Sequence, residues 1–154
     1  MKIHCVYSEL VNVDLLKPFP RNRNSHPQDQ IERLAKLLEY QGLRAPIVVS
    51  KRSGCIVKGH GTLAAIKQNG WTTAPVVYQD FESDEQEYAY VQSDNGIAAW
   101  SELDFSGINS DLADLGPLDL DLLGLKSFDI DPPQKKEKKP KEAVCPSCFH
   151  QFTV

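Results

Sequence analysis

The chain has 154 residues and a mass of 17.2 kDa, which suffices for one sizeable hydrophobic core but not for two full domains. Its 41% hydrophobic and 25% charged residues are typical of a soluble globular protein. No apolar run approaches the roughly 18 to 20 residues that span a membrane, and no signal peptide is evident. We therefore expect a cytoplasmic protein with no membrane partner.

Charge is distributed in blocks along the chain. Residues 1–70 hold 11 Lys and Arg against 5 Asp and Glu, a charge of +6, whereas residues 71–131 hold 1 against 14, a charge of −13. Residues 132–154 return to +3. The first block could face phosphate and the second would repel it. The alternative is that these charges only solvate the faces of a stable domain.

The first half of the first block predicts a strand, a loop and a helix. Apolar residues over 3–11 predict the strand, and the prolines and asparagines of 17–27 predict the loop. Ser25 and Gln28 fit a capping box, after which apolar residues recur at helical spacing. Gly42 can end this helix in a left-handed conformation.

Short β-branched runs dominate the next part of the chain. Residues 46–50 and 55–58 predict a hairpin, because Lys-Arg-Ser-Gly joins them. A helix over 63–69 should end at Gly70, and 74–78 should form the next strand. This order of elements predicts an α+β fold with a small mixed β-sheet and surrounding helices.

The acidic block predicts further helices. Ser83 and Gln86 fit a second capping box, and the helix should run toward Trp100, with 94–96 (Asp-Asn-Gly) as a break. The leucines of 103–125 predict short helical turns that cover the core. We assign 129–142 to a charged flexible linker and 143–154 to a separate small module.

The sharpest local signal is Gly59-His60-Gly61-Thr62, between a predicted strand and a predicted helix. Its glycines allow the backbone to approach a ligand, and free N–H groups at a helix start attract anions, above all phosphate. His60 could move a proton or contact phosphate, and Thr62 could cap the helix or donate to an oxyanion. A purely structural turn is the alternative. If the preceding loop folds over the same strand ends, it would add three polar side chains, those of Arg21, Arg23 and Asn24.

Four motifs in order resemble the ParB/sulfiredoxin-like domain, in the branch found in phage and mobile-element proteins. They are Leu16–Asn22, Gly42–Val49, Val57–Ala65 and Ser93–Asn95. The resemblance spans about residues 8–125 and assigns residues 1–128 to this domain. It implies the ParB/sulfiredoxin-like fold and a site that handles phosphate, since relatives include nucleotide-hydrolysing, phosphotransfer and DNase proteins.

The resemblance also suggests roles for single residues. Asp94 and Asn95 could supply a metal ligand or a polar anchor if they reach the glycine motif, and Mg²⁺ and a nucleotide would then be cofactors. His60 stands where sulfiredoxins carry their catalytic cysteine, which argues against sulfinic-acid repair. Thr62 replaces the arginine that usually follows Gly-His-Gly in the phage-like branch, so phosphate would be held more weakly.

Cys145 and Cys148 form a second constellation. The sequence Cys-Pro-Ser-Cys resembles one knuckle of a zinc ribbon, in which two thiolates occupy one edge of a tetrahedral zinc site. Completion would need His150, a partner or a second chain, and a homodimer that supplies the pair twice is the simplest solution. An unmetallated remnant and a redox pair are the alternatives.

These features leave two main hypotheses of function. The first is a ParB-like nuclease or nucleotidase that binds nucleic acid or a nucleotide, with His60 and Asp94 as catalytic residues. The second is a non-catalytic module that binds DNA or a protein, accessory to DNA modification or anti-defence, whose binding would depend on salt. A weaker third hypothesis makes 80–131 an acidic surface that blocks a nucleic-acid-binding protein.

Overall fold

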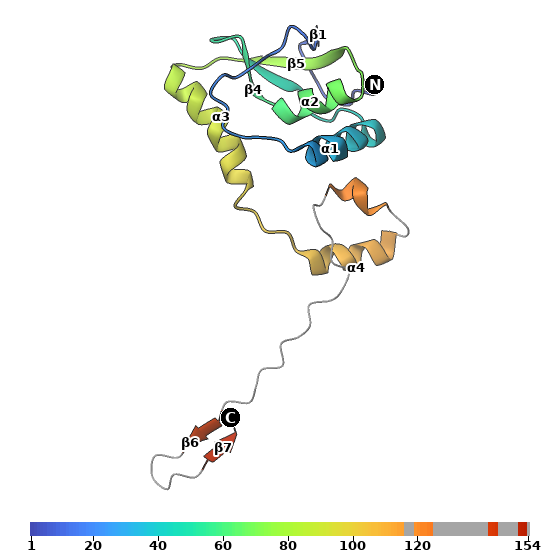
Figure 1. Cartoon of the computed structure of the whole chain (residues 1–154), viewed down its shortest axis with the longest axis vertical. Coiled ribbons are helices and arrows are strands. Elements are labelled where there is room, and N and C mark those ends of the chain that lie inside the picture. Colours follow the sequence, from blue (N-terminus) through green and yellow to red (C-terminus); the bar gives the residue numbers. More distant parts are fainter. Residues whose placement is uncertain (116–118, 125–141, 145–150, 154) are drawn as a thin grey trace.

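The computed structural model describes residues 1–115, 119–124, 142–144 and 151–153 (Figure 1). Its helical elements are α1 (Gln28–Gln41), α2 (His60–Gln68), α3 (Asp84–Ala98), α4 (Phe105–Leu115) and the 3₁₀ turn η1 (Leu120–Leu123). Its strands are β1 (Glu9–Asn12), β2 (Lys17–Pro18), β3 (Ile47–Ser50), β4 (Cys55–Lys58), β5 (Thr73–Gln79), β6 (Glu142–Val144) and β7 (Gln151–Thr153).

The first five strands form one mixed sheet in the order β1-β5-β3-β4-β2. β3 runs parallel to β5 and β2 parallel to β4, whereas β1 with β5 and β3 with β4 are antiparallel. The hairpin of β3 and β4 and the strand β5 confirm the sequence prediction, as does the α+β class with a small mixed sheet. β3 lies at the centre, and all four of its residues are buried.

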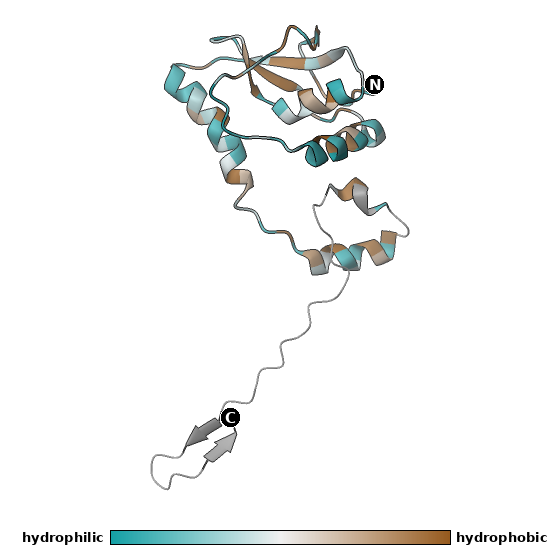
Figure 2. Cartoon of the chain, in the orientation of Figure 1, coloured by the Kyte–Doolittle hydropathy of each residue, from teal (hydrophilic) through white to brown (hydrophobic). Residues whose placement is uncertain are grey.

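Both faces of the sheet are covered. Ile47 and Val49 of β3 belong to a core cluster with Leu63 and Ile66 of α2, whereas the intervening Val48 packs in a second cluster. That second cluster also holds Phe19, Val57 and, from α3, Val91. Successive side chains of a strand point to opposite faces, so β3 needs apolar residues at consecutive positions. Figure 1 shows α1 beside α2, and Figure 2 shows the apolar residues concentrated on the strands.

Two helix starts differ from the sequence prediction. α1 has Pro27 as its N-cap with no side-chain cap hydrogen bond, so the predicted capping box of Ser25 and Gln28 is wrong. Ser25 lies two residues before this N-cap, and its hydroxyl does not cap the first turn of α1. α2 begins at His60 rather than at residue 63. The sequence did not predict this start because residues 60–62 include no apolar side chain that helical periodicity could reveal.

Two other boundaries were also predicted incorrectly. The strand expected over 3–11 is limited to Glu9–Asn12, while Ile3 makes a single bridge to Leu43. The Asp94-Asn95-Gly96 segment does not break α3, which continues to Ala98. The capping box that starts α3 is confirmed, since the Ser83 side chain accepts a hydrogen bond from the Gln86 backbone N–H at 3.2 Å.

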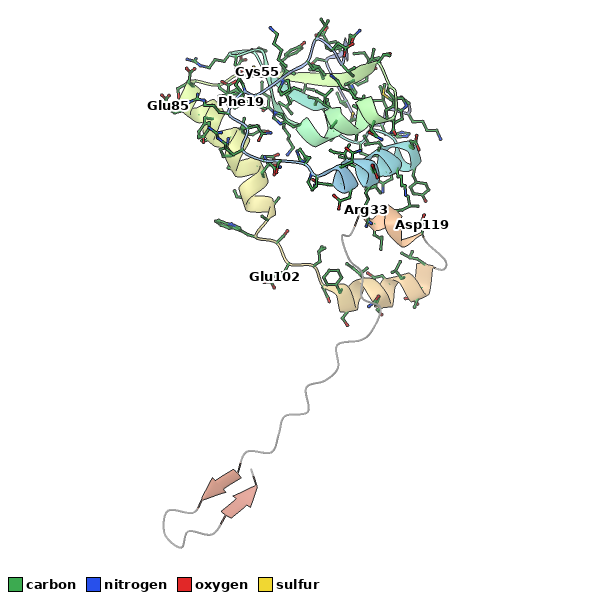
Figure 3. All side chains as sticks on the ribbon, viewed as in Figure 1. Phe19, Arg33, Cys55, Glu85, Glu102 and Asp119 are labelled. Carbon is green, nitrogen blue, oxygen red and sulfur yellow. The ribbon has the colours of Figure 1, made fainter. Side chains whose placement is uncertain are left out.

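The leucines of 103–125 were predicted to cover the core, but the region after α3 packs differently. α4 contains no buried residue, and Leu103 and Leu115 are 54% and 77% exposed, so the prediction is wrong for α4. η1 does contact α1. In Figure 3, Glu102 marks the segment that leads from α3 toward α4. Within the described ranges, no helix combines the length and apolar character that a membrane crossing needs.

β6 and β7 pair as a separate antiparallel ladder. The predicted zinc ligands Cys145 and Cys148 lie between these strands in sequence, but outside the described residues, as does His150. Most of the linker expected at 129–142 also lies outside them. The zinc site, the linker and the dimer through the tail therefore stay predictions.

Candidate functional site

A cavity of about 240 Å³ opens at the N-terminus of α2. It is lined by residues from β4, α1, α2, α3 and the loop before α1, namely His26, Leu34, Val57, Lys58, Gly59, His60, Gly61, Thr62, Asp94 and Asn95. The structure thus brings the predicted glycine motif together with Asp94 and Asn95. His26 and Lys58 were not predicted as site residues, although Lys58 directly precedes the motif.

Gly59 makes this architecture sterically possible. It is the N-cap of α2, with φ of 100° in the left-handed region, and a Cβ atom there would lie 3.3 Å from Cγ1 of Ile47. A side chain would therefore be strained by both the backbone and its neighbour. Glycine lets β4 turn directly into α2, so that the start of the helix faces the cavity.

The first turn of α2 supplies hydrogen-bond donors. The Leu63 backbone N–H donates to the Gly59 carbonyl at 2.9 Å, so the N–H groups of residues 60–62 precede the first bond of the helix. No side chain caps them, and Thr62 lies inside the first turn rather than at the N-cap. Together with the positive end of the helix dipole, these groups favour an anion.

His60 is tied into the fold through its Nε2 atom. The Phe19 backbone N–H donates to Nε2 at 3.1 Å, so in the neutral ring the proton resides on Nδ1. Partial burial, with a smaller contribution from the charge of His26, lowers the pKa of His60 below its usual value of 6.5. The imidazole is therefore neutral at pH 7, and accepting a proton at Nε2 would break its bond to Phe19.

The loop before α1 is fastened to α3. Asn24 donates from Nδ2 to Oδ1 of Asn95 at 2.8 Å, and Gln92 of α3 donates to the Arg21 carbonyl at 3.0 Å. The Arg21 guanidinium lies over the ring of Tyr88, 5.2 Å from its centroid. These contacts place Asn24 beside the cavity lining but turn the Arg21 side chain along α3.

The two arginines of the loop do not line the cavity. Arg21 instead lines a second pocket of about 360 Å³ with Arg52 and Glu87, and Arg23 is exposed. Phe19 and Cys55, which also line that pocket, lie near the N-terminal half of α3 in Figure 3. The predicted phosphate contacts of Arg21 and Arg23 therefore have no support from the position of this loop.

Lys58 and Asp94 form an ion pair at the cavity, with 2.5 Å between Nζ and Oδ1. The hydrogen bond to Asp94 raises the pKa of Lys58 above its usual value, so the ammonium is charged at neutral pH. The ring of His26, another residue of the cavity lining, lies against Gly61, where a Cβ would be 3.1 Å from Cε1 of His26. The Lys58–Asp94 ion pair therefore links β4 to α3 at the cavity.

The described residues do not form a ready metal site. Within them, no group of three or more His, Cys, Asp and Glu side chains is close enough to hold a metal ion. Asp94 and Asn95 offer one carboxylate and one amide, and the carboxylate is already paired with Lys58. Further ligands for Mg²⁺ would therefore have to come from water or from a bound phosphate, and the predicted Mg²⁺ cofactor stays a prediction.

Solved structures that are similar to this chain include chromosome-partitioning proteins. C-terminally truncated ParB from Caulobacter crescentus complexed with CTP-gamma-S is 18% identical with a TM-score of 0.58, and the match covers 70% of this chain and 61% of that chain. The same protein complexed to the centromeric parS site is 18% identical with a TM-score of 0.49, and the match covers 70% of this chain and 56% of that chain. A Pnob8-like ParB-N domain is 21% identical with a TM-score of 0.48, and the match covers 71% of this chain and 47% of that chain. The first of these establishes the likeness of fold.

The family assignment comes from the sequence itself. No curated protein sequence matches this chain significantly. The family model for the ParB N-terminal domain matches residues 5–95, which is more than half of the 154 residues and includes the whole cavity lining. The chain belongs to the ParB N-terminal domain family.

Proposed function

We propose that this chain is a DNA-associated protein of the ParB type whose α2 cavity binds the phosphate groups of a nucleotide. The observation that carries the proposal is the cavity, in which the first-turn N–H groups of α2 and the Lys58 ammonium meet. The ParB relative with the same fold is complexed with CTP-gamma-S, which supports a nucleoside triphosphate as ligand. Family membership supports the association with DNA.

Turnover at this cavity would depend on two residues that already have partners. A nuclease or nucleotidase would use His60 or Asp94 to move a proton or to hold a metal ion. The Nε2 atom of His60 accepts from Phe19, and the carboxylate of Asp94 is paired with Lys58. Both groups therefore have partners within the fold, which a catalytic role would have to displace. An origin in a phage or mobile element remains a prediction from the motifs.

Substitutions at Thr62 test the nucleotide site without endangering the helix. A glutamate in the first turn is favourable for the helix dipole but would repel a phosphate group. Isothermal titration with CTP, ATP and GTP should show binding to the wild type that Thr62→Glu weakens at least about tenfold. Thr62→Gln has the same size without the charge, so the difference between the two variants measures electrostatic repulsion.

Two further measurements decide between the hypotheses. If no nucleotide binds the wild type at millimolar concentration, the nucleotide site is rejected. DNA association is tested separately by fluorescence anisotropy of a labelled duplex at several salt concentrations, where phosphate contacts predict weaker binding as salt rises. Release of inorganic phosphate or cleavage of the duplex would favour the catalytic hypothesis.

A further inference from the structure

The Lys58–Asp94 ion pair has an unusual position for a surface pair, because both partners line the candidate phosphate cavity. Lys58 is the last residue of β4 and immediately precedes Gly59, whereas Asp94 lies on α3. Among the residues that line this cavity, Lys58 is the single Lys or Arg and Asp94 the single carboxylate. An anion that enters the cavity would therefore meet one cation, the Lys58 ammonium, and would compete for it with the Asp94 carboxylate.

The geometry allows the lysine to change partner. The Lys58 side chain is 47% exposed and that of Asp94 is 29% exposed, so the pair is in contact with solvent. Pairs of this kind are weakly held, and a lysine has a flexible stem and three rotatable donors. A phosphate group at the first turn of α2 would carry more negative charge than the carboxylate and would compete for the same ammonium group.

We propose that Lys58 is a phosphate-binding residue and that its ion pair with Asp94 is a latch, which holds the cation until a phosphate takes it. This inference rests on the proposed function, since it assumes that the cavity accepts phosphate. In it, Asp94 is not a ligand of the anion. It is a positioning residue that lowers the affinity of the cavity by occupying Lys58.

A double-mutant cycle separates this latch from simple repulsion by Asp94. Wild type, Lys58→Gln, Asp94→Asn and the double variant are titrated with inorganic pyrophosphate and, separately, with CTP, in EDTA to remove divalent cations. Asp94→Asn should tighten binding about fivefold and Lys58→Gln should weaken it about tenfold. With Lys58 absent, the gain from Asp94→Asn should fall below about twofold, because no cation remains to be released.

Two controls accompany the cycle. Lys51 and Asp80 form a comparable ion pair, 2.8 Å between Nζ and Oδ2, whose residues do not line the cavity. Asp80→Asn removes the same charge from such a pair and should leave the dissociation constant unchanged. Lys58→Arg retains a cation and should keep most of the binding, and circular dichroism of each variant verifies its fold.

The outcomes distinguish the latch from the proposed function. Equal gains from Asp94→Asn with and without Lys58 would mean that Asp94 only repels anions, and the latch would be rejected. Unchanged binding in folded Lys58→Gln would reject Lys58 as a phosphate ligand. If neither pyrophosphate nor CTP binds any of the four proteins, either in EDTA or with Mg²⁺ restored, the proposed nucleotide site fails and the latch fails with it. Binding by the wild type together with an additive cycle rejects the latch alone.

Discussion

His60 lies in the middle of the predicted phosphate motif, yet its imidazole already serves the fold. Its Nε2 atom accepts from the Phe19 backbone N–H, which fastens the segment after β2 to the start of α2. Phe19 is itself buried against Val57 and Val91. One side chain thus links the second core cluster to the cavity, and its protonation state should influence the stability of the whole domain.

Replacing His60 by glutamine tests this link through its pH dependence. Because partial burial lowers the pKa of His60 in the folded protein below 6.5, the unfolded chain binds the proton first as the pH falls. Stability should therefore be greatest above about pH 7 and decline as the pH falls through about 6.5 toward the lower pKa of the folded state. His60→Gln should lose less of its free energy of unfolding over this window, measured by urea denaturation.

The same substitution should also cost stability at neutral pH, by about 1 kcal/mol, because the Phe19 N–H loses a well-placed acceptor. His4→Gln at an exposed histidine is the matched control. A pH dependence as steep in His60→Gln as in the wild type would assign the titration to another group.

At the scale of the element, the turn from β4 into α2 determines where the cavity opens. Helical periodicity indicated α2 only from residue 63, because residues 60–62 contribute no apolar side chain to the pattern. The left-handed N-cap at Gly59 moves the helix start back by a turn. The residues predicted as a loop therefore form the first turn of the helix, whose N–H groups precede the first helical hydrogen bond, and these residues line the cavity.

Gly59→Ala should reveal how tightly this turn is built. An alanine would adopt φ near the glycine value of +100° and place its Cβ 3.3 Å from Ile47, so a loss of about 2 to 3 kcal/mol in unfolding free energy is expected. Gly54 has φ of +69° with no atom near its ideal Cβ, so Gly54→Ala should cost about 1 kcal/mol from backbone strain alone. Equal losses from the two variants, measured by denaturant unfolding, would show that contact with Ile47 is unimportant.

The elements that sequence reasoning found are those that depend on local pattern. β-branched runs identified β3, β4 and β5, and the Ser83 capping box identified the start of α3. Contacts between distant elements had no such signal. The pairing of Lys58 with Asp94 joins residues 36 positions apart, and Arg21 turns toward Tyr88 only because α3 passes alongside the loop. The site was therefore predicted as a motif, but its ionic partners were not.

At the scale of the whole molecule, the charge blocks correspond to different kinds of structure. The basic block 1–70 supplies β1 to β4, α1 and α2, whereas much of the acidic block forms α3, α4 and η1. Among the residues whose burial the structure describes, the buried apolar ones lie between Val13 and Val91, and α4 has none. The core of the sheet is therefore complete before the chain reaches α4.

A fragment of residues 1–101 should consequently fold on its own. It retains both core clusters and the cavity lining, and it loses the contact of η1 with α1. Circular dichroism should show an α+β spectrum and cooperative unfolding, with a free energy lower than that of the full chain by about 1 to 2 kcal/mol. Non-cooperative melting of the fragment would mean that α4 and η1 are integral to the fold. If the fragment melts cooperatively and binds CTP as the full chain does, the acidic segment is an appendage and both core and cavity belong to residues 1–101.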